Sequence, residues 1–395
     1  NHGHDYDNAL TQSRDDSRTD LFSISHMKSC TVAFRVDASS KIGSGHVHRC
    51  LALASALKSS GANVEFICRA HVGSLLDLIR SRGFAYHVLE RPNAPREDVY
   101  PWLGVSYEED KADTVGVIKK IGYVDWLVID HYGIGIEWER ELKPYVGSRL
   151  VIDDLANRAH DCEVLLDQNL FPNAERRYAS LVPLNCAMLL GPKYALLRDE
   201  FSRNQQQLCQ PDYDPSSRIF VFFGGVDFTN ETLKFLRACF EAKKFPDGVE
   251  VVVGAQNRNL EDIRKIIRND GRINLHVQVD NIAKVMRRCN YAFGAGGTTN
   301  WERFALGLNA SVTSVADNQI ESSLYLQERD LIDYLGESPA VSVECYRRAL
   351  STLRPSSELM RVRSMKITAL VDGHGTRRVA ALLLNRNRIE TTCYL

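Results

Sequence analysis

The sequence predicts an α/β protein with two domains, each a doubly wound parallel sheet. Short apolar runs rich in Val, Ile and Phe alternate with helical segments through both halves of the chain. Strands that are apolar along their whole length are typical of parallel sheets covered by helices on both faces. The expected strands are 31–36, 64–68, 126–130 and 150–153 in the first half, and 219–223, 249–253, 275–279, 291–293 and 311–315 in the second.

Length and composition limit the possible classes of protein. A chain of 395 residues is long enough for two domains, and its 44% hydrophobic content supports packed cores. The formal net charge of −1 gives no reason to expect nucleic acid or an anionic membrane as a partner. No apolar run approaches the roughly 18 residues that span a bilayer. The ten cysteines form no C-x-x-C pair, which argues against a zinc site and predicts reduced thiols in a cytoplasmic protein.

The domain boundaries follow from changes in composition. Residues 1–26 are polar and lack the apolar core of a secretory signal, so we expect a disordered extension or tag before Met27. The first Rossmann-like domain is expected at 27–202, followed by a linker rich in Gln and Pro at 203–217. The second is expected at 218–395, with its last helix packing back on the first domain.

The most informative segment is the glycine turn around Gly43, Gly45 and His46, which follows the strand 31–36 and precedes a helix expected at 47–60. Glycines let the backbone approach a ligand closely, and the free amides at a helix start favour an anion. His46 would bring a proton-transfer group to that ligand. The alternative is a tight connection with a structural histidine, and this segment alone does not separate the two.

Two further glycine turns occur in the second half. Gly224 and Gly225 follow the strand 219–223, at the end of a strand where ligands bind in such sheets. The turn at 296–299 adds threonine hydroxyls to free amides, which predicts a seat for a diphosphate without a metal. Glu302, one turn into the next helix, would accept hydrogen bonds from a ribose diol. Its alternative role is to complement the helix dipole.

Polar side chains also end two strands of the first half. Asp130, His131 and Tyr132 follow the strand 126–130, where Asp130 could orient a histidine and Tyr132 could bind the substrate or the attacking group. Asp153 and Asp154 end the next strand, and one of the two is expected only to cap a turn. No G-x-S-x-G or H-E-x-x-H motif occurs, which excludes serine-hydrolase and zincin classes.

Taken together, these motifs resemble the family of UDP-2,4-diacetamido-2,4,6-trideoxy-β-L-altropyranose hydrolases. The resemblance runs from about residue 28 to 385. It is carried by FRVDAS at 34–39, IGSGHVHRC at 42–50, IDHYG at 129–133, IDDLA at 152–156, GPKYALLR at 191–198, FGGVD at 223–227, GGTTNWE at 296–302 and DG at 372–373.

The resemblance implies the B-type glycosyltransferase fold and a cofactor-free, metal-independent hydrolase of pseudaminic acid biosynthesis. Such an enzyme releases UDP and the free sugar, with inversion at the anomeric carbon. The family's proposed base corresponds to His46, and a family active-site tyrosine corresponds to Tyr132. Substrate contacts are expected at Asp37, Gly43, Gly45, Arg49, Asp130, His131, Asp153 and Arg198. UDP contacts are expected at Gly224, Gly225, Gly296, Gly297, Thr298, Thr299 and Glu302.

The sequence departs from the family pattern in three places. His48 stands where the family more often has an apolar or lysine-like residue, Val226 replaces a small polar residue, and residues 97–110 look like an acidic, aromatic insertion. These departures leave the exact sugar open. A glycosyltransferase of the same fold and a non-catalytic nucleotide-sugar binding protein remain as alternatives. We expect a monomer, because the two domains must close on the ligand.

Overall fold

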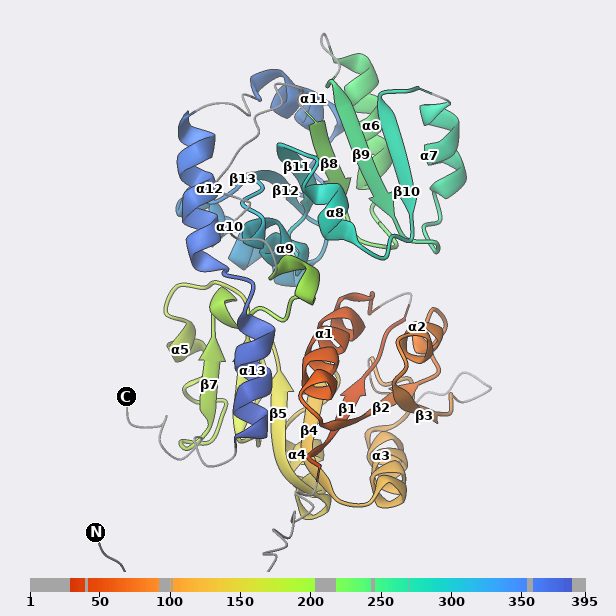
Figure 1. Ribbon diagram of the computed structural model, residues 1–395, viewed down its shortest axis with the longest axis vertical. Coiled ribbons are helices and arrows are strands. Elements are labelled where there is room, and N and C mark those ends of the chain that lie inside the picture. Colours follow the sequence, from red (N-terminus) through yellow and green to blue (C-terminus); the bar gives the residue numbers. More distant parts are fainter. Residues whose placement is uncertain are drawn as a thin grey trace, which may run out of the picture.

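The structure is a computed structural model that describes residues 29–39, 42–91, 100, 102–202, 218–242, 246–268, 270–353 and 358–385. The expected extension at 1–26 and linker at 203–217 lie outside these residues. Two α/β domains are stacked along the long axis of the molecule, each around one parallel sheet (Figure 1). The predicted fold class is confirmed.

The first domain is built on a seven-stranded sheet with the order β3-β2-β1-β4-β5-β6-β7. Its strands are β1 Thr31–Val36, β2 Asn63–Arg69, β3 Ala85–Leu89, β4 Val124–Asp130, β5 Val146–Ile152, β6 Val164–Asp167 and β7 Ala187–Leu190. Its helices are α1 Gly45–Ser59, α2 Leu76–Ser81, α3 Tyr107–Ile121, α4 Ile136–Leu142 and α5 Ala174–Tyr178. Side chains alternate along β1, so that Val32 and Phe34 pack in the core with α1, whereas Ala33 packs in the core with α3 and α4.

The second domain is built on a six-stranded sheet with the order β10-β9-β8-β11-β12-β13. Its strands are β8 Arg218–Phe222, β9 Gly248–Val253, β10 Ile273–Val277, β11 Tyr291–Ala295, β12 Ala310–Ser314 and β13 Asp333–Glu337. The helices that follow residue 218 are α6 Glu231–Glu241, α7 Leu260–Ile267, α8 Ile282–Met286, α9 Thr299–Ala305, α10 Ile320–Glu328, α11 Val343–Thr352, α12 Glu358–Leu370 and α13 Gly375–Leu384.

All nine expected strands are present, and four strands of the structure were not expected. Three of these, β3, β7 and β13, lie at sheet edges, where one side of the strand has no neighbour and the apolar run is weaker. The fourth, β6, is fully buried but has only four residues, which is too short to stand out from its surroundings. The expected helix at 47–60 is α1, which begins two residues earlier, inside the glycine turn.

The strand order places the predicted motifs at two crevices. In the first sheet β1 lies between β2 and β4, and in the second β8 lies between β9 and β11. The connections therefore leave to opposite sides at these points, and a crevice opens beyond the carboxyl ends of the strands. The loops after β1, β4, β8 and β11 carry the turn at 43–45, Tyr132, the turn at 224–225 and the turn at 296–299. The two crevices open toward one interdomain cavity.

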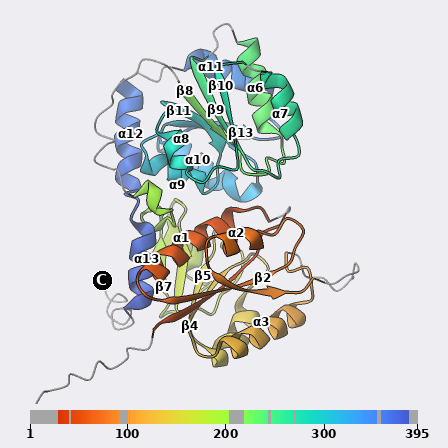
Figure 2. The ribbon, with the colours of Figure 1, turned by 45° about the vertical axis from the view of Figure 1, so that its right-hand side comes forward.

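The chain crosses between the domains twice. Leu197 and Phe201, which follow the first sheet, pack in the core of the second domain together with Trp301. Conversely, α13 lies beside α1 in the first domain (Figures 1 and 2), where Val379 and Leu383 share its core. This exchange ties the two sheets together at the side of the cavity.

Candidate active site

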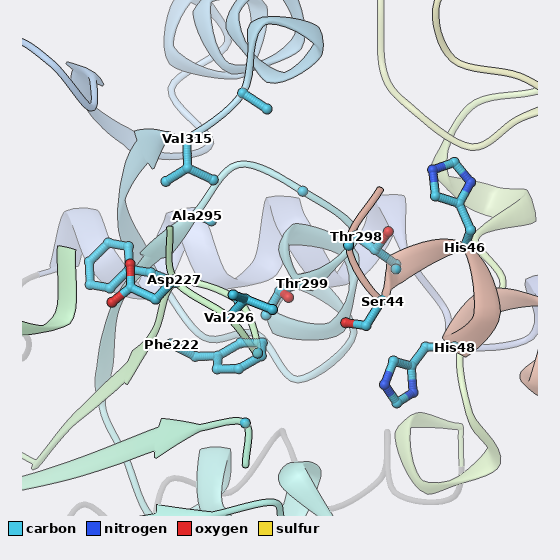
Figure 3. A pocket seen from close by; sticks show the side chains of 18 of the residues that line it. Ser44, His46, His48, Phe222, Val226, Asp227, Ala295, Thr298, Thr299 and Val315 are labelled. Carbon is cyan, nitrogen blue, oxygen red and sulfur yellow. The ribbon is translucent and has the colours of Figure 1, made fainter. Parts of the chain in front are cut away.

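A cavity of about 580 Å³ lies between the two domains and is lined by both. It includes thirteen of the predicted site residues: Gly43, Gly45, His46, Arg49, Tyr132, Arg198, Gly224, Gly225, Gly296, Gly297, Thr298, Thr299 and Glu302. In Figure 3, Ser44 lies next to Thr298, and His46 and His48 project from the start of α1 in different directions. Residues from four loops that are far apart in the sequence thus meet at one site.

His46 lies in the first turn of α1 and is held by a buried carboxylate. Its Nδ1 lies 2.5 Å from Oδ1 of Asp130, which is 1% exposed. Arg49 donates two hydrogen bonds to the same carboxylate, from Nη2 to Oδ1 and from Nε to Oδ2, both at 2.7 Å. Burial would raise the pKa of Asp130, but the charge of Arg49 and the contact with His46 hold it well below its usual range.

This arrangement determines the tautomer of the imidazole. Because an ionised carboxylate only accepts hydrogen bonds, Nδ1 of His46 carries the proton that is donated to Asp130. Nε2 then keeps its lone pair, and the side chain lines the cavity. The imidazole of the Asp130–His46 pair therefore belongs to the cavity wall, and Nε2 is the ring nitrogen that is not bound to Asp130. Asp130 itself lies behind His46 and outside the lining, so the expectation that it contacts the substrate is corrected.

Tyr132 forms the next part of the wall and joins the two domains. Its ring packs edge-on against His46, with centroids 4.6 Å apart and an interplanar angle of 85°. Its hydroxyl donates to Oδ1 of Asp154 at 2.9 Å and accepts from Nδ2 of Asn318 in the second domain at 3.0 Å. Burial raises the pKa of Tyr132 far above its usual value, and the negative charge of Asp154 raises it further. Tyr132 is thus a neutral phenol in a fixed position.

Asp37 and His131 do not line the cavity, which corrects the expectation that they bind the substrate. Asp37 is 1% exposed and accepts hydrogen bonds from Nη1 of Arg35 and from the backbone N–H of Arg69, both at 2.7 Å. Nε2 of His131 lies 3.1 Å from the other oxygen of Asp37. These groups connect the ends of β1, β2 and β4 in the interior, behind the cavity wall.

The acidic pair after β5 divides in the opposite way to that expected. Asp153 is fully buried, accepts from Nη1 of Arg158 at 2.8 Å and from the backbone N–H of Ala156 at 2.9 Å, and does not reach the cavity. Its neighbour Asp154 lines the cavity and binds Tyr132. Neighbouring side chains after a strand point to opposite sides, and the sequence does not show which of the two faces the ligand.

The glycine turns of the two domains approach each other closely. A Cβ added to Gly45 would lie 4.0 Å from Oγ1 of Thr298, and one added to Gly225 would lie 3.8 Å from Oγ of Ser44. Gly224 has a φ of 100°, a conformation that favours glycine. At the start of α1, Ser44 makes no side-chain capping bond and the first turn has no acidic residue. Free amides of α1 thus remain available to an anion between the turns.

Arg198 and Glu302 close the cavity at the domain junction. Nη2 of Arg198 lies 3.3 Å from Oε1 of Glu302, and both side chains line the cavity. The same nitrogen lies 3.2 Å from Oε1 of Glu200, which does not line it. Glu302 therefore has one oxygen engaged by Arg198 and a second that can accept hydrogen bonds from a ligand.

Several lining residues were not predicted as site residues: Ser44, His48, Trp102, Asp154, Asn169, Gln256, Gln278, Asn318 and Gln319. Asn318 and Gln319 follow the expected strand 311–315, and this position after a strand is the signal that could have identified them as site residues. His48 was noted only as a departure from the family pattern. Burial, followed by repulsion from Arg198 and Arg82, lowers the pKa of His48 to about 4. It is therefore a second, neutral imidazole in the cavity at neutral pH.

The described residues contain no group of three or more His, Cys, Asp or Glu side chains placed to hold a metal ion. The eight cysteines in this part of the chain form no disulfide. No helix in this part of the chain is long and apolar enough to cross a bilayer.

Comparison with known proteins gives the same fold and a related sequence. No family model matches the chain. It is similar to MurG of Acinetobacter baumannii, with a TM-score of 0.61 and 14% identity over 90% of this chain and 99% of that one. It is also similar to the calicheamicin glycosyltransferase CalG4, with a TM-score of 0.58 and 16% identity over 91% of this chain and 99% of that one. These likenesses establish the B-type glycosyltransferase fold.

The sequence relationship is more specific. The chain is 28% identical over 298 residues to the UDP-2,4-diacetamido-2,4,6-trideoxy-β-L-altropyranose hydrolase of Campylobacter jejuni, which covers 75% of this chain and 96% of that protein. The matched length spans both domains and nearly the whole relative. The chain is therefore related in sequence to the UDP-2,4-diacetamido-2,4,6-trideoxy-β-L-altropyranose hydrolase of Campylobacter jejuni over both of its domains.

Proposed function

We propose that the protein hydrolyses UDP-2,4-diacetamido-2,4,6-trideoxy-β-L-altropyranose to UDP and the free sugar, as a step of pseudaminic acid biosynthesis. The observation that carries this proposal is the Asp130–His46 pair, whose imidazole belongs to the wall of the interdomain cavity. The relationship to the Campylobacter jejuni hydrolase supports the choice of substrate. We further propose that the enzyme acts as a monomer, since one chain provides all the residues of the proposed site. We also propose that it acts in the cytoplasm.

The proposed reaction is a direct displacement at the anomeric carbon. The oxygen of water forms a bond to this carbon while the bond to the β-phosphate oxygen breaks, and its electron pair leaves with the diphosphate. Nε2 of His46 takes the proton that the water loses. Because water and leaving group lie on opposite faces of the ring, the configuration inverts. Tyr132 holds the wall beside the base through its bonds to Asp154 and Asn318.

The leaving group needs charge stabilisation more than a proton, because a nucleoside diphosphate is a stable anion. Free amides at the start of α1 and in the turn at 296–299 would surround a diphosphate placed between the glycine turns. Thr298 adds a hydroxyl, which accepts a hydrogen bond from Nε2 of Gln168 at 3.5 Å. The pyrophosphate would then lie where both domains contribute, with the sugar toward His46 and the nucleoside toward the second domain.

The experiment that tests this function follows both phosphorus and protons by NMR, with the purified protein, the diacetamido-trideoxy donor and EDTA. We expect UDP and free sugar to appear together, with the inverted anomer formed first. A donor that binds but stays unchanged would contradict hydrolysis. Consumption that requires an added acceptor would instead identify a glycosyltransferase, and binding without turnover of any donor would identify a nucleotide-sugar binding protein.

Glu302 provides a test of the nucleotide subsite. We expect Glu302→Gln to weaken UDP binding about tenfold, because a hydrogen bond to a charged group is worth about 1.5–3 kcal/mol. Calorimetry should show that the wild-type protein prefers UDP to 2′-deoxy-UDP and that the variant does not. Glu200→Gln is the matched control, since Glu200 also contacts Arg198 but does not line the cavity. Equal losses in the two variants would show that Glu302 acts only through Arg198.

A further inference from the structure

One tryptophan differs from the other three in its exposure. Trp126, Trp138 and Trp301 are at most 1% exposed, whereas Trp102 is 44% exposed. Trp102 also lines the interdomain cavity. A large aromatic surface left in water at the wall of a cavity is available to an apolar part of a ligand.

The exposed position of Trp102 is imposed by the turn that holds it. Its φ is 74°, a left-handed conformation that is unfavourable for a residue with a bulky side chain. The backbone N–H of Tyr100 donates to the carbonyl of Val105 at 2.8 Å, and Leu103 and Val105 are fully buried in the first-domain core. Leu103 and Val105 thus anchor the turn in the first-domain core, while the indole of Trp102 stays exposed.

The turn is also seated firmly on the first domain. Gly104 has a φ of 75°, and a Cβ added there would lie 2.7 Å from Cε1 of His71. His71 lies in the loop after β2 that leads to Leu75, another apolar residue of the cavity wall. The close fit at Gly104 thus seats the turn against the loop that follows β2.

Trp102 continues a row of aromatic rings that leads to the base. Its centroid lies 6.0 Å from that of Tyr132, with an interplanar angle of 77°, and Tyr132 in turn packs on His46. All three rings belong to the first domain. The glycine turns at 224–225 and 296–299, proposed to hold UDP, belong to the second. Trp102 therefore lies on the sugar side of the cavity.

We propose that Trp102 is a specificity-determining residue of the sugar subsite, which selects UDP-sugars that carry methyl groups of deoxy and acetamido substituents. This inference rests on the proposed function and deepens it. A methyl group against the indole removes apolar surface from water, whereas a hydroxyl at the same place would lose its hydrogen bonds to water. One methyl group in an apolar pocket changes kcat/KM by about 10–200-fold. The residue lies in the segment 97–110, which we expect to be an insertion relative to the hydrolase family that the sequence resembles.

The first test compares two donors. UDP-N-acetylglucosamine has hydroxyls at C4 and C6, where the diacetamido-trideoxy donor has an acetamido group and a methyl group. We expect Trp102→Ala to lower kcat/KM for the latter donor about 10–100-fold, mostly through KM, while the affinity for UDP alone stays within about twofold. The preference between the two donors should fall by a similar factor. Trp102→Phe, which keeps an aromatic face, should retain most of the preference for the diacetamido-trideoxy donor. An unchanged preference in Trp102→Ala would overturn the inference.

The second test does not depend on turnover. Because the other tryptophans are buried, acrylamide should quench mainly the fluorescence of Trp102, and Trp102→Phe should remove this component. In a His46→Ala background, which should slow consumption about 10³-fold, the diacetamido-trideoxy donor should protect Trp102 while UDP alone should not. A donor that is not hydrolysed by the wild-type protein but protects Trp102 would disprove the proposed function and keep this inference. A donor that leaves the quenching unchanged would overturn the inference, whether or not it is hydrolysed.

Discussion

Replacement of His46 by alanine should lower the turnover number about 10³-fold, because a positioned general base contributes roughly 10²–10⁴-fold to rate. The affinity for UDP should stay within about threefold, since the diphosphate is proposed to bind backbone amides and threonine hydroxyls. Release of UDP, followed by phosphorus NMR, measures the first quantity, and calorimetry measures the second. The side chain is only 7% exposed, so thermal unfolding should be recorded for each variant.

Two further variants define what the imidazole does. His46→Gln can still donate a hydrogen bond to Asp130 but has no basic nitrogen, so we expect it to be as slow as His46→Ala. His87, which pairs with Glu65 at 3.0 Å in the first sheet and lies outside the cavity lining, is the control histidine, and His87→Ala should keep normal turnover. Full activity of His46→Gln would show that this position only organises the loop. Loss of UDP binding in His46→Ala would make it a nucleotide ligand.

Asp130→Asn should lower turnover by a similar factor, about 10³–10⁴-fold, by removing the group that fixes the imidazole tautomer. An amide can donate to Nδ1 of His46, which would place the proton on Nε2 and leave no basic nitrogen facing the cavity. The substitution also leaves the buried Arg49 without its bidentate partner. We therefore expect a loss of stability of about 3 kcal/mol, reduced by the remaining contact with Asp154 at 3.4 Å.

A second variant separates catalysis from folding. In Asp130→Asn combined with Arg49→Gln the uncompensated buried charge is gone, so the midpoint of thermal unfolding should recover while turnover stays low. Normal turnover in Asp130→Asn would contradict the assignment of Asp130 as the positioning residue of His46. Recovery of activity together with stability would show that Asp130 acts only on folding.

The same carboxylate predicts how stability depends on pH. The pKa of Asp130 is held well below its ordinary value of about 3.9, so its interactions stabilise the folded state fully above that pH. As the pH falls below about 4, the unfolded chain binds a proton that the folded chain does not, and this contribution is lost. Urea unfolding between pH 3 and 6 should show a shallower acid decline for the double variant than for the wild-type protein.

Local pattern was enough to predict the fold and the motifs of the cavity. Eight of the nine expected strands are mostly buried and nearly continuous in apolar character, as parallel strands between helices must be, and the glycine turns follow three of them directly; the exception is the edge strand β10. The carboxyl ends of parallel strands share one edge of a sheet. The turns after β1, β4, β8 and β11 must therefore lie at the edges where ligands bind. His46, Tyr132 and the turn at 296–299 could therefore be predicted as a group.

The orientation of individual side chains was decided by the tertiary structure. Asp153 and Asp154 are adjacent residues of the same type, so the sequence does not distinguish their roles. In the folded domain, the first is buried in the interior and the second lines the cavity. Asn318 reaches Tyr132 only because the second domain brings it there across 186 residues of chain. Trp102 was part of an unexplained insertion until a left-handed turn was seen to hold its indole at the wall. Periodicity along the chain specifies strands and turns, but contacts between distant segments decide which side chains face the ligand.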